Sequence, residues 1–266
     1  VYIDISFLHM RDTLEFIRDE FGIERMLFGI GYKSHYGSAI ATLAQSSLNE
    51  QEKQAIAHKN LENLLNIAPL QAKLAKAPAI LAEKPVWQAF SQGTKLSGFT
   101  TFDAHSHTGP FARGWFLRDL ANLDTQLQNI LNHMDKVGVE KIAMIGESAL
   151  FSDPIKGNRD FELLAEKYTD RICAYFVYNP YYNEQLSEKL LDEFFSRGFF
   201  IGFKTLCSYW KIKINDPSFS IMWEYADKYK LPILNHSWND NWNAPEELTE
   251  IAPKYPNAIF ILGHAG

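Results

Sequence analysis

The chain has 266 residues, of which 46% are hydrophobic and 22% are charged. This balance is typical of a globular protein and argues against a disordered chain. The formal net charge of −6 argues against a nucleic-acid partner, because phosphate binding depends on an excess of Lys and Arg.

The two cysteines, Cys173 and Cys207, lie in apolar stretches and lack CxxC spacing. Such cysteines are typical of buried, reduced side chains, so we expect a cytoplasmic protein. The longest apolar run is shorter than the roughly 18–20 residues of a membrane span, and the first residues lack the features of a signal peptide. We therefore expect no membrane partner.

The first 66 residues predict two units of strand and helix. Residues 1–7 and 25–32 are expected to be strands, with a helix over residues 11–20 between them. The run Ser47-Leu48-Asn49-Glu50 fits a capping box and predicts a helix that continues to about residue 66. The Ala-, Lys- and Pro-rich segment over residues 67–98 is expected to be a connector.

Residues 99–266 predict six further strands, which alternate with helices. The strand candidates are almost continuously apolar, which is typical of parallel strands buried on both faces. They cover residues 101–105, 141–146, 172–178, 199–206, 231–236 and 258–264. Helices are expected over residues 118–136, 158–168, 183–197, 217–230 and 245–252.

Two strands before the connector and six after it make eight, the number in a TIM barrel. An open doubly wound sheet would give the same alternation, so the count alone leaves both architectures open. In a barrel, the active site lies at the carboxyl ends of the strands. Reactive side chains gathered at those ends would therefore favour the barrel.

Histidines lie where three of these strands end. His105 and His107 are two residues apart at the end of one strand, so both side chains face the same side. His236 and His264 each end a later strand. Neutral imidazoles are common ligands of divalent metal ions, and the pattern predicts a metal site.

Several segments resemble motifs of the amidohydrolase superfamily. FDAHSHTG, GFKTL, LPILNHSW and FILGHAG are similar to its first, fourth, fifth and sixth strands. The branch with the greatest resemblance is the amidohydrolase-related one, which includes decarboxylases of aromatic and related acids and several lactone hydrolases. VYIDIS and ERMLFGIGY resemble strands seven and eight, and LNEQEKQAIAHKNLENLL resembles the closing helix. The resemblance implies a (β/α)8 TIM barrel.

The order of these segments is unusual, because strands seven and eight precede strands one to six. We expect residues 1–66 to be the C-terminal part of a barrel, residues 67–98 a connector, and residues 99–266 the N-terminal part. The chain starts at Val1 and ends on an apolar segment, so it is expected to be cut from a tandem protein. A circularly permuted barrel that closes on itself is the alternative.

The resemblance also implies roles for individual residues. His105, His107 and His236 would bind one divalent metal ion, with Zn²⁺ the expected metal. His264 would be a fourth ligand or a general acid and base, and Lys204 a substrate-binding or structural lysine.

Further residues near the expected site have weaker signals. Arg113 and Trp115 follow the histidine pair in a loop, where an Arg can hold a carboxylate and a Trp can stack on a ring. Glu147 and Asn179 end the second and third strands and are candidates for lining a pocket. Asp103 is expected to support the site or cap a helix.

One position departs from the family pattern. The eighth strand usually ends in an aspartate that completes the site, whereas this sequence has Gly31 there. His35, four residues later, is a substitute candidate, although a surface histidine is the simpler interpretation. If residues 1–66 belong to an upstream barrel, Gly31 implies that the upstream barrel is catalytically inactive. If they complete this barrel, its site lacks the aspartate and normal turnover is not expected.

These features support three hypotheses. The first is a metal-dependent hydrolase of an ester, lactone or amide of a small organic acid. The second is a metal-dependent, non-oxidative decarboxylase of an aromatic or related acid. The third is a barrel that has lost catalysis and has a structural or regulatory role. The expected partner is a small organic-acid substrate, and barrels of this branch commonly pair, so a homo-oligomer is also considered.

Aromatic residues make up 14% of the chain and have two interpretations. They are either packing residues of the barrel or the lining of a pocket for a planar acid. The candidates lie around the third and fourth strands, at Tyr178, Tyr181, Tyr182, Phe199, Phe200, Phe203, Tyr209 and Trp210.

Overall fold

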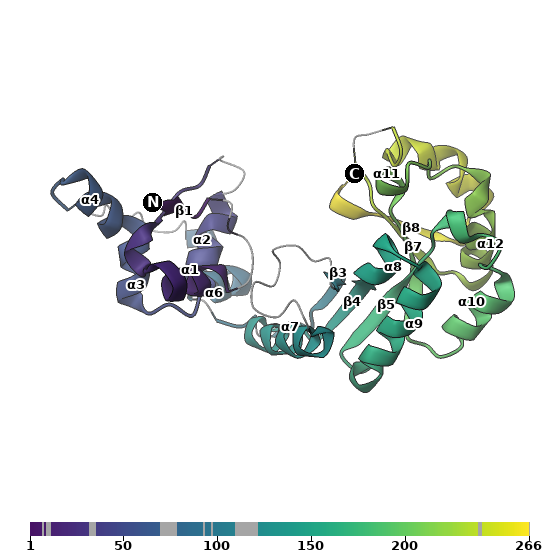
Figure 1. Cartoon of the computed structure of the whole chain (residues 1–266), viewed down its shortest axis with the longest axis horizontal. Helices are drawn as coiled ribbons and strands as arrows, with labels where there is room; N and C mark the ends of the chain where they lie inside the picture. Colours follow the sequence, from purple (N-terminus) through teal and green to yellow (C-terminus); the bar gives the residue numbers. More distant parts are fainter. Residues whose placement is uncertain are drawn as a thin grey trace. The chain divides into compact units, whose positions relative to one another are not determined.

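The computed structural model describes residues 1–6, 8, 12–31, 36–69, 79–92, 94–96, 98–109, 122–238 and 241–265. The chain divides into two compact units, the first formed mainly by residues 1–99 and the second mainly by residues 100–266. Figure 1 shows the first unit in purple to blue and most of the second in teal to yellow.

The first unit contains a small parallel sheet. Strand β1 (Ile3–Asp4) pairs with β2 (Met26–Leu27), and helix α1 (Thr13–Phe21) connects them. The strands predicted over residues 1–7 and 25–32 are therefore much shorter than expected. The 3-10 turn η1 (Ile23–Arg25) includes the first residue of the second predicted strand. Phe28, directly after β2, donates its N–H to Ile56 O rather than to a neighbouring strand. The core of this unit is formed by Ile5, Leu14, Ile17, Met26, Leu48 and Ile56.

The predicted capping box is displaced by two residues. Asn49, not Ser47, begins helix α3 (Glu50–Gln54): its Oδ1 accepts from Glu52 N at 3.0 Å, and Glu52 Oε2 accepts from Asn49 N at 2.8 Å. Ser47 instead donates from N and Oγ to Glu15 Oε1, at 2.6 and 2.9 Å. Asn is as good an N-cap as Ser, and here it has a Glu three residues later.

The remaining helices of this unit follow the small sheet along the chain. Helix α2 (Tyr36–Gln45) precedes the cap, and α3 continues through a π-helical turn, η3 (Ala55–Lys59), into α4 (Asn60–Leu65). The helix predicted to reach about residue 66 is thus confirmed. Within the predicted connector, α5 (Ala79–Ala82) and α6 (Pro85–Gln92) are helical.

The second unit is built on a six-stranded parallel sheet, and all six predicted strands are present. Each strand pairs in parallel with the next one along the chain. The strands are β3 (Phe102–Thr108), β4 (Lys141–Gly146), β5 (Ile172–Val177), β6 (Phe200–Thr205), β7 (Pro232–Asn235) and β8 (Ile259–Leu262).

Helices connect these strands, as a sheet of parallel neighbours requires. They are α7 (Leu123–Val137), α8 (Glu147–Phe151), α9 (Pro154–Ala165), α10 (Glu188–Phe195), α11 (Cys207–Trp210) and α12 (Ser220–Tyr229). Figure 1 shows α9, α10 and α12 along one side of the strands. The α-helix predicted over residues 245–252 is instead two 3-10 segments, η7 (Pro245–Glu250) and η8 (Ala252–Lys254). Pro253 cannot donate a backbone hydrogen bond and clashes with the preceding turn, which prevents a continuous α-helix.

The six-stranded sheet is curled. In a flat sheet, five spacings of about 4.8 Å would separate the edge strands β3 and β8 by roughly 24 Å. Yet the ring of His105, on β3, lies 5.3 Å from the ring of His264, which follows β8. The two ends of the sheet must therefore curve toward each other, as the strands of a barrel do.

Burial differs between the middle and the edges of this sheet. Every residue of β5 is buried, whereas the edge strands expose large apolar side chains. Phe102 on β3 is 52% exposed, and Ile259 and Leu262 on β8 are 52% and 42% exposed. These values fit the position of β3 and β8 at the two edges of the sheet formed by the described residues.

Closure of an eight-stranded barrel stays a prediction. Among the described residues, β1 and β2 form a sheet of their own, separate from β3 to β8. The α/β class and the curled parallel sheet are thus observed, while the assignment of strands seven and eight to residues 1–66 is not tested.

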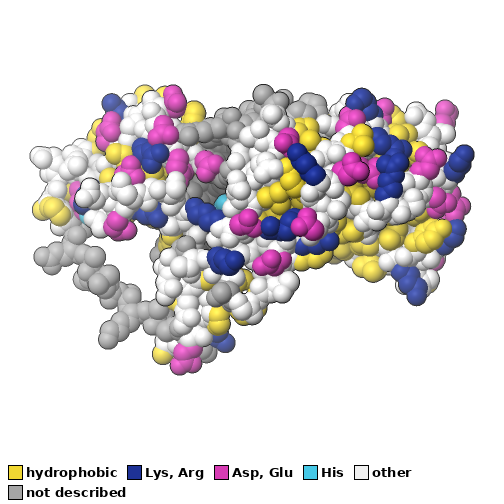
Figure 2. Space-filling model, turned by 90° about the horizontal axis from the view of Figure 1, so that it is seen from below, with side chains coloured by type: hydrophobic (Ala, Val, Ile, Leu, Met, Phe, Trp, Pro, Cys, Tyr) yellow, Lys and Arg dark blue, Asp and Glu magenta, His cyan; other side chains and the backbone are white. Residues whose placement is uncertain are grey.

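Two surface properties complete the description. None of the helices in the described ranges is long and apolar enough to cross a membrane. On the face seen in Figure 2, basic and acidic side chains are interspersed rather than gathered by sign.

Gly157 allows helices α8 and α9, which follow the carboxyl end of β4, to approach each other closely. A Cβ at Gly157 would lie 2.4 Å from Ala149 N and 2.5 Å from Ala149 Cα. We expect Gly157→Ala to lower the free energy of unfolding by about 1–3 kcal/mol, because backbone atoms must move apart. Urea unfolding followed by circular dichroism measures this change.

Gly37→Ala is the matched control, because a Cβ at Gly37 would meet nothing within 4 Å. It should leave stability unchanged or raise it by about 0.4–1 kcal/mol. Equal losses in the two variants would contradict the close approach of α8 and α9.

Candidate metal centre

The predicted reactive side chains lie at the carboxyl ends of four strands. His105 and His107 belong to β3, and Lys204 lies one residue before the end of β6. His236 directly follows β7, and His264 lies in the turn η9 (Gly263–Ala265) that follows β8. Because all six strands are parallel, their carboxyl ends lie at the same end of the sheet.

The histidines of β3 form a close pair. Their Nε2 atoms are 3.2 Å apart, and their ring centroids 5.2 Å. Asp103 supports this arrangement, because its Oδ1 accepts from His105 N at 3.0 Å. The strand also shifts register between Asp103 and Ser106 in its pairing with β4. The predicted orientation of both rings toward one side is thus observed.

His264 joins the pair from the opposite edge of the sheet. Its ring centroid lies 5.3 Å from that of His105 and 4.7 Å from that of His236. The backbone of His264 has φ 59°, in the left-handed region that few non-glycine residues adopt. Such conformations are held by surrounding structure and concentrate at functional sites.

Gly263 explains how the end of β8 reaches this position. A Cβ at Gly263 would lie 2.7 Å from Asn235 O and 3.6 Å from His105 Cε1. A side chain at this point would push β8 away from β7 and from the histidine pair. Only glycine therefore allows the close approach that brings His264 beside His236.

Lys204 lies beside the pair and is fully buried. Its Nζ is 3.4 Å from His105 Nε2, and its side chain is 0% exposed. Burial lowers the pKa of Lys204 to about 7, because a desolvated ammonium is unstable. Lys204 thus lies beside the histidines and is buried inside the unit rather than at its surface.

The same burial keeps the imidazoles neutral. Desolvation, followed by the charge of Lys204, lowers the pKa of His105 to about 4 and that of His107 to about 3. Both causes also lower the pKa of His264. At pH 7 these rings therefore have free lone pairs, which metal ligands require.

The histidine pair fits a divalent metal ion in part. Two nitrogens bound to one tetrahedral Zn²⁺ at about 2.0–2.1 Å are about 3.3 Å apart, close to the 3.2 Å observed. Within the described ranges, however, no group of three or more His, Cys, Asp or Glu side chains is arranged to hold a metal. The spacing of His105 and His107 suits two metal ligands. The assignment of His236 as the third ligand stays a prediction.

Two exposed aromatic rings adjoin the histidines and have weak or no sequence signals. Tyr209, in α11, packs its ring 6.0 Å from that of His236, and Trp238 lies 5.9 Å from His264. Tyr209 is one of several aromatic residues around the fourth strand. Trp238 is the last residue of the segment LPILNHSW, in which His236 alone has a predicted role.

Most of the other aromatic candidates belong to the core. Phe200 and Phe203 pack with Phe176, at centroid distances of 5.5 and 6.1 Å, and Phe199 packs on Phe161 at 5.7 Å. Tyr178 is fully buried, and its hydroxyl donates to Asn183 Oδ1 at 2.9 Å. Phe176 also contacts Phe194 of α10, and Phe203 contacts Tyr225 of α12. These side chains thus pack helices α9, α10 and α12 against the sheet, and the packing interpretation is correct for them.

The other candidates are distributed as follows. Glu147 directly follows β4, Asn179 lies two residues after β5, and both are buried. Asn179 caps the turn η5 (Pro180–Tyr182), because its Oδ1 accepts from Tyr181 N. Arg113, Trp115 and His35 lie outside the described residues. Gly31 lies in the first unit with φ 58°, and it has no side chain to bind a metal or move a proton.

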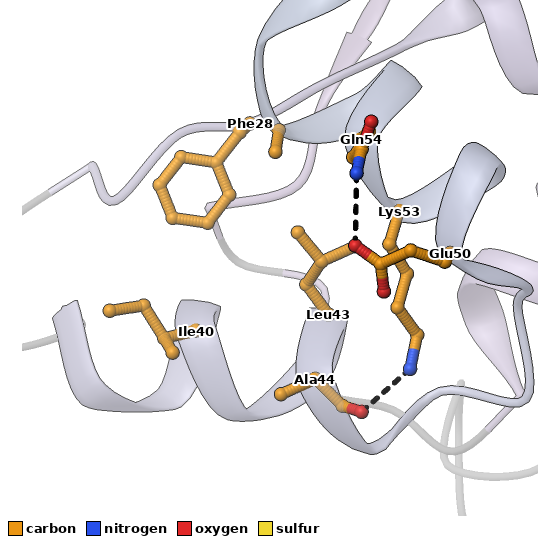
Figure 3. Close-up of a pocket in the computed structure, with 8 residues that line it drawn as sticks. Phe28, Ile40, Leu43, Ala44, Glu50, Lys53 and Gln54 are labelled. Carbon is orange, nitrogen blue, oxygen red and sulfur yellow. Dashed lines mark hydrogen bonds between the residues drawn. The ribbon is translucent and has the colours of Figure 1, made fainter. Parts of the chain in front are cut away.

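A pocket in the first unit is a different kind of cavity (Figure 3). It has a volume of about 390 Å³ and mainly apolar walls that include Phe28, Ile40 and Leu43. Its polar groups bond one another: Lys53 Nζ donates to Ala44 O at 2.8 Å, and Gln54 Nε2 donates to Glu50 Oε1 at 3.2 Å. This pocket thus lacks the converging reactive groups found at the strand ends.

No protein-family model and no curated protein matches the sequence. Solved structures do resemble it. An amidohydrolase II has 15% identity over 63% of this chain and 67% of its own, with a TM-score of 0.43. A manganese-bound 5-carboxyvanillate decarboxylase from Novosphingobium aromaticivorans has 14% identity over 64% and 66%, with a TM-score of 0.49.

A dihydroxybenzoic acid decarboxylase from Polaromonas, also with bound manganese, has 16% identity over 63% and 66%, with a TM-score of 0.44. The chain thus spans about two thirds of each of these proteins. The structures it resembles are thus an amidohydrolase and two decarboxylases. At such low identity the likeness concerns the fold alone, and the roles of residues rest on the geometry of this chain.

The role of Gly263 can be tested directly. We expect Gly263→Ala to weaken binding of Zn²⁺ or Mn²⁺ by at least about 10-fold, the size of effect seen when residues that orient ligands are changed. The physical reason is the contact with Asn235 O, which forces β8 and His264 outward. Isothermal titration calorimetry measures the affinity, and Gly37→Ala is the control. Unchanged affinity in a folded Gly263→Ala protein would contradict this role.

Proposed function

We propose that the second unit is the core of a metal-dependent hydrolase that cleaves an ester, lactone or amide of a small organic acid. The observation that supports this most is the convergence of His105, His107, His236, His264 and Lys204 from four strand ends. Titratable groups that meet from distant parts of the sequence, His105, His107 and Lys204 among them with clearly lowered pKa values, are typical of functional sites.

The side chains divide into ligands and a proton carrier. His105 and His107 would hold one divalent cation through their Nε2 atoms, with His236 as the third ligand. Zn²⁺ is the metal we propose, because three imidazoles with an open position are a common catalytic zinc site. When bound, the metal would polarise the substrate carbonyl and activate water.

His264 is the proposed general base and acid. Its ring is in contact with those of His105 and His236, it is solvent-exposed, and its lowered pKa leaves it neutral at pH 7. A neutral, exposed imidazole can take a proton from water and return it to the leaving group. Lys204 is the proposed substrate-binding residue. Its ammonium lies beside His105, where it would attract a carboxylate or a carbonyl oxygen.

The first test is the metal content of the full chain. After purification with added Zn²⁺, we expect about one ion per chain by elemental analysis, and loss of that ion in a His105→Ala/His107→Ala double variant. His58→Ala is the matched control, because His58 lies in the first unit and bonds Glu62 Oε1. Absence of metal from a folded wild-type chain would contradict the proposal.

The reaction is then identified by its products. Metal-loaded protein is incubated with a panel of lactones and esters and with a panel of aromatic acids. Release of free acid, lost in His264→Ala, supports hydrolysis. Release of carbon dioxide from the aromatic acids instead assigns the site to non-oxidative decarboxylation and overturns the hydrolase proposal.

Gly31 supports a second candidate of another class, a barrel that binds metal without catalysis. No carboxylate stands where the sequence motif would have one, and Gly31 adopts φ 58°. This candidate predicts a bound ion but no turnover of either panel. Metal binding with activity would exclude it.

A further inference from the structure

Exposed apolar side chains gather on helix α4 of the first unit. Leu61, Leu64 and Leu65 are 40%, 45% and 57% exposed, and Ile67, just past the end of the helix, is 47% exposed. The three leucines are three and four residues apart, so they form one stripe along the helix. Figure 1 shows α4 at the far end of the first unit, beyond β1, α1 and α2. Contiguous exposed apolar patches of this kind mark interaction sites on soluble proteins.

The pocket of the first unit (Figure 3) lies next to this leucine stripe on the same helix. Helices α3, η3 and α4 follow one another without a break. Ala57, in η3, lines the pocket, and Leu61 comes four residues later. Side chains four residues apart are neighbours on a helix surface. Apolar surface therefore continues from the pocket onto the stripe.

The pocket suits apolar side chains such as those of the stripe. It has a volume of about 390 Å³, and its apolar walls include Phe28, Ile40 and Leu43. Two polar contacts at its edge are internal: Lys53 Nζ donates to Ala44 O, and Gln54 Nε2 donates to Glu50 Oε1. An apolar side chain can therefore enter the pocket without competing for these bonds.

Charge favours one end of a helix at this pocket. Lys53 brings an ammonium group to the lining. Helix α4 ends at Leu65, and the last carbonyls of a helix have a partial negative charge. The C-terminal end of an α4 helix thus complements the pocket both in its leucines and in its charge.

Each chain contains both halves of this contact, in an order that suits a two-fold dimer. The helix residues that line the pocket lie within residues 50–57, and the stripe lies within residues 61–65. Two such helices packed antiparallel about a two-fold axis near residue 59 bring the stripe of each copy onto the pocket of the other. In this register Leu61 faces Ala57 of the other copy, and Leu64 faces Gln54.

We propose that this face of the first unit is the contact surface between two copies of the chain, with Leu61, Leu64 and Leu65 of each copy packed against the pocket of the other. The contact involves none of the histidines of the second unit. The proposal is therefore independent of the proposed function and does not require a bound metal.

Sedimentation velocity of the full chain without added metal is the first test. One helix pair buries less surface than a standard protein interface, so we expect a dimer that forms between about 1 and 100 µM. The double variant Leu64→Gln/Leu65→Gln should weaken the dimer by at least about 10-fold, because it removes apolar side chains from the centre of the contact.

Both leucines are exposed in the single chain, so circular dichroism should show that the double variant is folded. Leu163→Gln is the matched control, because Leu163 is 58% exposed on α9 of the second unit. It should leave the association unchanged. Equal weakening by Leu163→Gln and by the double variant would overturn the proposal.

A disulfide cross-link tests the register. Gln54 and Leu64 of one chain are ten residues apart on the helix, roughly 15 Å, whereas a disulfide joins Cα atoms within about 7 Å. We therefore expect Gln54→Cys/Leu64→Cys to form a covalent dimer on oxidation, seen by gel electrophoresis without reducing agent. The native Cys173 and Cys207 are buried and should not contribute.

The single variants distinguish the pocket from other ways of pairing. Gln54→Cys and Leu64→Cys should each stay uncross-linked alone and should cross-link when mixed. Efficient cross-linking of Leu64→Cys alone would show that the stripes pair with each other, which overturns the pocket as the binding surface. A wild-type chain that stays monomeric up to about 100 µM would overturn a second copy as the partner, whatever else binds the stripe.

Discussion

The contact between His105 and His264 depends on the curl of the parallel sheet. These residues belong to its two edge strands, yet their ring centroids are 5.3 Å apart. Curling follows from the right-handed twist of parallel strands and from the helices that cover one face. Every other feature of the candidate site, including the burial of Lys204 and the neutral imidazoles, requires the strand ends to converge in this way.

Close backbone approaches make that convergence possible. Gly263 brings the end of β8 against Asn235 O, at the end of β7, where a Cβ would lie 2.7 Å away. Asn235 is itself buried and accepts from Thr205 Oγ1 at 3.1 Å. The ends of β6, β7 and β8 are therefore joined by packing and hydrogen bonds, and the histidines extend from a rigid edge.

The aromatic residues of the second unit have two separate roles. One group packs helices α10 and α12 onto the sheet through edge-on contacts such as that of Phe176 with Phe194 at 4.9 Å. The other, Tyr209, Trp238 and Phe151, is exposed beside the histidines. Exposure of three large rings at one place is unfavourable in water unless a ligand or another surface covers them.

The sequence by itself determined the six strands of the second unit, the close histidine pair and the placement of His236 and His264 at strand ends. These follow from local periodicity and from spacing along one strand, which neighbours in the chain decide. The N-cap at Asn49, the short β1 and β2 and the 3-10 turns after residue 245 were not predictable, because competing caps and turns differ by only about 1 kcal/mol. Only the tertiary structure decided that β8 returns to β3, that Lys204 is fully buried, and that Tyr209 and Trp238 flank the histidines. Such contacts join residues up to about 160 positions apart, and they depend on sheet curvature that no local pattern encodes.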